Sequence, residues 1–211
     1  MNISPSKENI LKRIRKALSH STPLPFPNSE GNQPVFQPLE QEPEIEFAEQ
    51  FTQLQGKFIY CINQQEFAFQ LSSLVKKQDW QKVYCVEEKL VAPALSQLSG
   101  RLVKTGLADC DVSITGCESL VARTGSIVMS SAQLSGRTTS VYAPVHICVA
   151  YTNQLVYEVK DALQAAKDKY GNNMPSLLTF ATGPSRTADI EKTLVVGVHG
   201  PKEVYVFLIE A

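Results

Sequence analysis

Residues Val145–Tyr151 read VHICVAY, and the stretch 155–169 that follows reads LVYEVKDALQAAKDK before Gly171. The first stretch is apolar and rich in β-branched residues, which is typical of a buried strand. The second stretch repeats apolar residues at helical spacing, and the glycine after it favours a helix end. A buried strand followed by a helix predicts the unit from which parallel sheets are built.

The rest of the body repeats this alternation. We predict further strands at residues 57–62, 82–86, 111–114, 126–129, 177–181 and 204–209. Helices are expected at residues 66–77 and 87–98, although Pro93 can interrupt the second of them. The sequence therefore predicts an α/β fold with a mostly parallel sheet flanked by helices. In such sheets, ligands usually lie beyond the carboxyl ends of the strands.

The amino-terminal part differs in composition from the body. Residues 1–20 contain a predicted amphipathic helix at 6–18, which can lie on its own domain, dock onto another subunit or lie on a membrane surface. Residues 21–43 carry six prolines, so we expect an extended linker. The α/β domain is then expected to span residues 44–211. Its entry is acidic, and we expect these carboxylates to be solvated: Glu40, Glu42, Glu44, Glu46 and Glu49.

Composition argues against several functions. The formal net charge of -1 supplies no excess of cations for nucleic-acid binding. No apolar run is long enough to span a bilayer, and no apolar segment follows the basic amino terminus as in a signal peptide. The chain has five cysteines, Cys61, Cys85, Cys110, Cys117 and Cys148, without C-x-x-C or zinc or iron–sulfur spacing. We therefore expect a reduced, cytoplasmic protein that binds no metal or redox cofactor itself.

The richest candidate for a binding site is the stretch 182–191, TGPSRTADIE, directly after a predicted strand. Gly183 permits an unusual backbone angle, and Ser185 and Thr187 can each cap the start of a helix. Backbone amides at such a turn, with Arg186 beside them, would form a cradle for a phosphate or carboxylate. The alternative is an ordinary turn in which Arg186 pairs with Asp189 or Glu191.

Two other stretches combine glycine with polar side chains. In GVHGP, residues 197–201, His199 followed by Gly200 can bind a ligand, act as a general base or simply hold the turn. In Arg123-Thr124-Gly125-Ser126, the amides and hydroxyls can face a ligand, or the stretch is a plain turn.

We regard a further histidine, His146, as a core residue. The sequence contains no P-loop, no G-x-S-x-G, no H-E-x-x-H and no G-x-G-x-x-G motif. The residues alone thus predict an α/β domain with a pocket for an anion.

These segments together resemble the lactate-utilisation (LUD) domain family. The resemblance rests on TGPSRTADIE, GVHGP, the TG of residues 115–116 with ARTGSI at 122–127, PVHICV at 144–149, and the opening helix ILKRIRKAL at 10–18. It covers nearly the whole chain, and the first two segments are specific as a pair. It implies a fold like that of the glucosamine-phosphate isomerase, ribose-phosphate isomerase and CoA-transferase superfamily.

The resemblance also implies a function. It points to a non-redox subunit that acts beside iron–sulfur partner proteins in oxidising L-lactate to pyruvate. Assembly into a homo-oligomer is a further expectation. The alternative is a free-standing isomerase- or CoA-transferase-like enzyme for a phosphorylated or acyl-CoA substrate, with His199 or Asp189 as base. One residue departs from the family pattern: the turn usually reads E-T-G-T, whereas this chain has Arg123 in the acidic position, which favours binding over acid–base chemistry.

Overall fold

The computed structural model of the chain describes residues 5–19, 38–190 and 193–211. Helix α1 (Pro5–Leu18) confirms the predicted amino-terminal helix and belongs to a different unit from residues Leu39–Ala211. Its Ile10 and Ile14 side chains are exposed. Most of the predicted linker, residues 21–43, lies outside the described residues, so its extended form stays a prediction.

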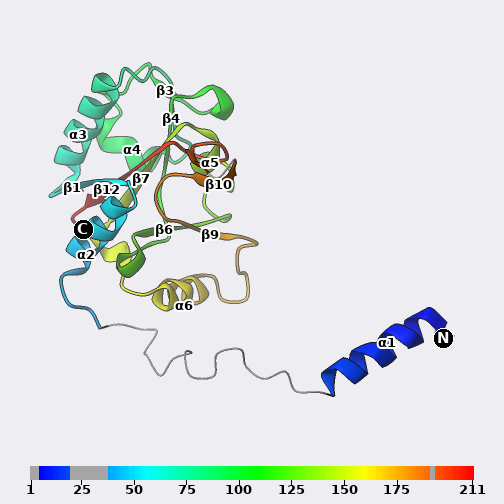
Figure 1. Cartoon of the computed structure of the whole chain (residues 1–211). Coiled ribbons are helices and arrows are strands. Elements are labelled where there is room, and N and C mark those ends of the chain that lie inside the picture. Colours follow the sequence, from blue (N-terminus) through cyan, green and yellow to red (C-terminus); the bar gives the residue numbers. More distant parts are fainter. Residues whose placement is uncertain (1–4, 20–37, 191–192) are drawn as a thin grey trace. The chain divides into compact units, whose positions relative to one another are not determined.

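Residues Leu39–Ala211 are organised around a sheet of six parallel strands (Figure 1). In order across the sheet, these are β1 (Lys57–Cys61), β12 (Glu203–Ile209), β7 (Val145–Tyr151), β4 (Val112–Thr115), β2 (Val83–Tyr84) and β3 (Leu102–Val103). Strands β7 and β12 pair along their whole length, from Val145 opposite Glu203 to Tyr151 opposite Ile209. The predicted α/β fold with a mostly parallel sheet is confirmed.

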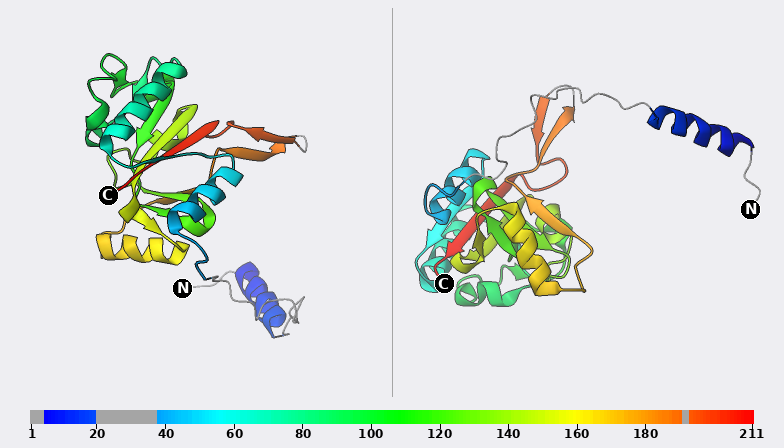
Figure 2. Two further views of the ribbon diagram at one scale, coloured as in Figure 1. Left: turned by 90° about the vertical axis from the view of Figure 1, so that its left-hand side faces the viewer. Right: turned by 90° about the horizontal axis from the view of Figure 1, so that it is seen from below.

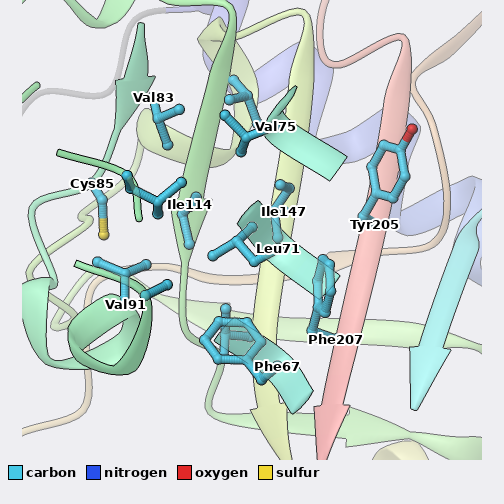
Figure 3. Packing of buried hydrophobic residues seen from close by; sticks show 14 of the residues in the cluster. Phe67, Leu71, Val75, Val83, Cys85, Val91, Ile114, Ile147, Tyr205 and Phe207 are labelled. Atoms are coloured by element: carbon cyan, nitrogen blue, oxygen red, sulfur yellow. The ribbon is translucent and has the colours of Figure 1, made fainter. Parts of the chain in front are cut away.

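One face of this sheet is covered by helix α3 (Gln64–Lys77) together with the short helix α4 (Glu88–Val91). Because side chains alternate along a strand, Ile147 of β7 and Phe207 of β12 both point to this face. Figure 3 shows Phe67 of α3 lying against Phe207, and the two ring centroids are 5.4 Å apart in an edge-to-face arrangement. Burial of each such side chain contributes about 1.5–3 kcal/mol to stability.

The opposite face packs against a second sheet and helix α2 (Pro43–Gln53). The second sheet has the order β8 (Leu155–Val156), β5 (Ser119–Val121), β6 (Ser126–Ser130) and β9 (Leu178–Ala181). Cys148 and Ala150 of β7 meet Leu120 and Ile127 of this sheet in a shared core. Helix α6 (Val159–Tyr170) covers the outer face of the second sheet through Ala162.

A hairpin of β10 (Arg186–Ile190) and β11 (Thr193–Val196) extends away from the two sheets (Figure 2). Helix α5 (Thr139–Tyr142) lies at the start of β7. The buried hydroxyl of Ser113 on β4 donates to the carbonyl of Thr139 at 2.7 Å, which fixes α5 to the main sheet.

Two helix predictions are corrected. The helix expected at 155–169 begins only at Val159, because Leu155–Val156 pairs with β5 as strand β8, although it ends before Gly171 as predicted. The helix expected at 87–98 is reduced to α4 and a 3-10 turn, Ala92–Ala94. Pro93 lies in that turn, and its missing N–H cannot continue α-helical hydrogen bonding.

The acidic segment, residues 40–49, was expected to be simply solvated, but most of it is helical. It forms most of helix α2, whose Phe47 and Phe51 are fully buried and stacked with ring centroids 5.4 Å apart. Glu44, Glu46 and Glu49 lie on this helix, which packs against the core between the two sheets, whereas Glu40 and Glu42 precede it.

Candidate functional site

The two glycine-bearing stretches near the carboxyl end of the chain meet at one cavity. The cavity has a volume of about 260 Å³, and residues 182–185 and 199–201 of the two stretches form part of its lining. Direct hydrogen bonds join the two stretches: the amide of Ser185 donates to the carbonyl of Pro201, and the amide of Gly197 donates to the carbonyl of Ser185, both at 2.9 Å. A Cβ on Gly200 would lie 2.9 Å from the Cβ of Ser185, so only glycine allows this approach.

The remaining lining comes from both sheets and from helix α5. It consists of Met129, Ser140, Val141, His146, Thr179, Ala181 and Val204. His146 and Val204 lie near the amino ends of β7 and β12, whereas Thr179 and Ala181 lie on β9. This cavity lies between the two sheets, near the amino ends of the central strands, and thus not beyond their carboxyl ends, where the sequence predicts a site.

His146 is the buried polar residue of this cavity. Only 1% of it is exposed, and its Nε2 lies 2.9 Å from Oγ1 of Thr115 on the neighbouring strand β4. Burial lowers the pKa of the imidazole to about 4. The ring is therefore neutral at physiological pH, and it can offer a hydrogen bond to a guest but no charge.

The prediction that His146 is a core residue is confirmed, because this histidine is buried. The prediction missed that His146 also lines the cavity. A signal was present in the sequence. Within VHICVAY, His146 occupies the same face of the strand as Cys148, opposite to Val145 and Ile147. A polar residue on the inner face of a buried strand needs a partner or a ligand.

Arg186 is engaged elsewhere. Its Nη2 donates to the carbonyl of Leu54 at 2.6 Å, the side chain is exposed, and it is not among the residues that line the cavity. Gly183 approaches the same carbonyl: its φ is +79°, and a Cβ there would lie 2.7 Å from Leu54 O. The Arg186 side chain thus holds the loop to the end of helix α2, and Gly183 allows the close approach. The position of Arg186 does not support the binding role predicted for it.

The expected helix start at Ser185 and Thr187 is wrong, because strand β10 begins at Arg186. Thr187 pairs across the hairpin with Val195. Asp189 lies on β10, but its side chain is outside what the structure describes, as is Glu191. The roles of Asp189 and Thr187 stay predictions.

The turn at Thr124, Gly125 and Ser126 does not line the cavity but supports it. Ser126 Oγ lies 2.8 Å from Oγ1 of both Thr124 and Thr182, so a chain of hydroxyls connects the turn to the cavity lining. Gly125 has a φ of +59°, and a Cβ there would lie 2.6 Å from the backbone nitrogen of Phe51. This glycine lets helix α2 pack directly on the turn.

The residue that departs from the family pattern, Arg123, has a structural partner. Its Nε lies 2.9 Å from Oε2 of Glu158, a buried carboxylate just before helix α6. The cation is therefore paired beside the start of helix α6, and it is not part of the cavity lining.

A second hollow, of about 450 Å³, adjoins the cavity and shares Val141, His199 and Gly200 with it. His199 is exposed at this junction, where it is open to a ligand. Tyr142, Val198 and Lys202 also line the second hollow. We call the first space the histidine cavity and the second the tyrosine hollow.

In the part of the chain that the structure describes, no three His, Cys, Asp or Glu side chains are grouped so that they could hold a metal ion. The described helices include none with the length and apolar character needed to cross a bilayer.

Residues 86–209, more than half of the chain, match the model of the LUD domain family. Lactate utilization protein C of Bacillus licheniformis is 33% identical over 102 residues, and that of Bacillus subtilis is 34% identical over 101 residues. Each match covers 47% of this chain and 42% of the relative, so the chain spans less than half the length of these relatives.

A crystal structure of a DUF162 family protein from Deinococcus radiodurans has the same fold, with a TM-score of 0.59 and 20% identity. The match covers 82% of this chain and 99% of the other. The wider likeness to the isomerase and CoA-transferase superfamily stays a prediction. The match over residues 86–209 confirms the resemblance that the sequence motifs indicate. The chain belongs to the LUD domain family.

Proposed function

We propose that the chain takes part in lactate utilisation as a cytoplasmic subunit that binds a small organic anion and has no redox centre of its own. The relatives named Lactate utilization protein C support the role in lactate utilisation. The observation that supports the binding role is the histidine cavity, where residues 182–185 and 199–201 converge beside His146.

The cavity has groups that suit a 2-hydroxy acid. The hydroxyls of Ser185 and Thr182 can donate to a carboxylate, and neutral His146 can exchange a hydrogen bond with the hydroxyl of the guest. Of the residues that line the cavity or the adjoining tyrosine hollow, Lys202 in the hollow supplies the positive charge, because His146 is uncharged and Arg186 binds Leu54.

The proposed partners follow from the chemistry of the reaction. Oxidation of lactate to pyruvate removes two electrons and two protons, and the electrons require a redox centre. The cysteines of this chain lack the spacing of iron–sulfur ligands, so we assign the electron-accepting clusters to partner subunits.

A chromosomal deletion tests the pathway. The deletion strain should lose growth on L-lactate as sole carbon source and keep growth on pyruvate, and co-purification of a tagged chain should retain proteins with iron–sulfur absorption. Normal growth of the deletion strain on L-lactate would contradict the proposal.

Complementation of that strain tests the cavity. Ser140→Leu places a larger side chain into the histidine cavity and should fail to restore growth, whereas Ser96→Leu, at an exposed site outside the cavity lining, should restore it. Thermal unfolding of both variants checks that they fold. Full complementation by folded Ser140→Leu would show that the cavity is not needed.

A further inference from the structure

The tyrosine hollow has apolar side chains that the core does not use. Tyr142 is 62% exposed, Val198 is 43% exposed and Val141 is 39% exposed, and all three line this one space. Solvent-exposed apolar side chains gathered in a hollow indicate a binding surface more often than scattered ones do.

The hollow adjoins the histidine cavity. Val141, His199 and Gly200 line both, so the two spaces are neighbours at these three residues. The character of the lining changes from one space to the other. Around His146 it offers hydroxyls such as Ser185, whereas around Tyr142 it offers a ring, two valines and the cation Lys202.

Both spaces are held in place by the fold. Helix α5 carries Ser140 into one space and Tyr142 into the other, and the buried hydroxyl of Ser113 fixes that helix to strand β4. On the opposite side, the hydrogen bonds between Ser185, Gly197 and Pro201 fix the loop that carries Val198.

We propose that the two spaces form one site, and that it selects 2-hydroxy or 2-oxo acids with a bulky apolar side chain over three-carbon acids. The acid end lies in the histidine cavity, and the side chain lies in the tyrosine hollow against Tyr142 and Val198. Lactate shares the acid end but has only a methyl group, which leaves the hollow unfilled. This inference rests on the proposed anion site and adds the class of side chain that the site takes.

Titration calorimetry of the full chain with L-lactate and with L-3-phenyllactate tests the inference. We expect phenyllactate to bind at least about tenfold more tightly, because its ring is removed from water in the hollow. Tyr142→Ser should reduce the affinity for phenyllactate to that for lactate and leave lactate binding unchanged. Val198→Ser should act in the same direction.

Leu134→Ser is the matched control, since Leu134 is also an exposed apolar residue, at 81%, but lines neither space. It should change neither affinity. Equal affinities for the two acids, or an equal loss of both in Tyr142→Ser, would overturn the inference and leave the anion site in place. Absence of binding for both acids would overturn the anion site itself, and the inference with it.

Discussion

The two faces of the six-stranded sheet are built from alternate residues of the same strands, yet they differ in kind. On β7, Val145, Ile147 and Val149 enter the core under helix α3. His146 and Cys148, their immediate neighbours, face the second sheet instead. The face under α3 is a continuous apolar core, whereas the other face includes a cavity with a buried polar ring.

This difference indicates which face of the sheet can hold a binding site. The face under α3 and α4 is packed mainly by apolar side chains and lines no cavity of this kind, so its residues contribute chiefly to stability. A face packed by a second sheet, helix α2 and two loops leaves a space at its edge, and the polar groups there need partners. Four substitutions test this division, and their expected effects decrease in order.

The largest effect is expected on the helix-covered face. Phe67→Ala removes a fully buried ring that packs edge-to-face on Phe207, and it should lower the free energy of unfolding by about 3–5 kcal/mol. Urea unfolding measures the change. Phe69→Ala on the same helix is the control, because Phe69 is 64% exposed and should cost far less. Similar losses for both variants would show that this face does not form the core described.

The next effect concerns the turn that supports the cavity. Gly125→Ala should cost on the order of 3 kcal/mol, since its positive φ disfavours any side chain and a Cβ would also press on the backbone of helix α2 at Phe51. Gly136→Ala isolates the first cause. Gly136 has a φ of +63° with no atom within 4 Å of its Cβ position, and we expect about 1 kcal/mol. Equal losses in thermal unfolding would argue against close packing of α2 on the turn.

A smaller effect should appear only in acid. The folded-state pKa of His146 is about 4, below the value of about 6.5 in the unfolded chain. As the pH falls below about 6.5, the unfolded chain gains a proton that the folded chain does not, so stability decreases. This amounts to about 2 kcal/mol between about pH 6.5 and about pH 5.

His146→Gln removes that loss. A glutamine does not titrate, and its amide can replace the hydrogen bond of Nε2 to Thr115. The difference between the unfolding free energies of the two proteins at each pH reports the histidine alone. Parallel pH profiles would mean that His146 titrates normally and is in contact with water.

The smallest effect is expected at Arg186. Arg186→Ala removes one exposed hydrogen bond to Leu54 and should lower stability by about 1 kcal/mol or less, with no change in the affinity for L-lactate. Urea unfolding and titration calorimetry measure the two quantities. A clear loss of affinity with unchanged stability would return Arg186 to the binding site.

The sequence by itself determined the class of fold. Strand β7 has the predicted bounds, and the alternation of strands and helices predicted the parallel sheet, because burial on both faces requires an apolar run such as VHICVAY. It also identified the two stretches that meet at the cavity, because glycine beside polar residues is a local property. The family followed from the same motifs.

Only the tertiary structure decided which side chains face the cavity. Arg186 stands in the stretch that the sequence favours most and His199 in a weaker one, yet Arg186 reaches the end of helix α2 and His199 lines the cavity, because β10 turns away from the sheets as a hairpin. His146 enters the site because the second sheet leaves space over its face of β7. The physical reason is that local patterns set which faces are apolar, whereas contacts between residues far apart in the chain set which polar groups are brought together.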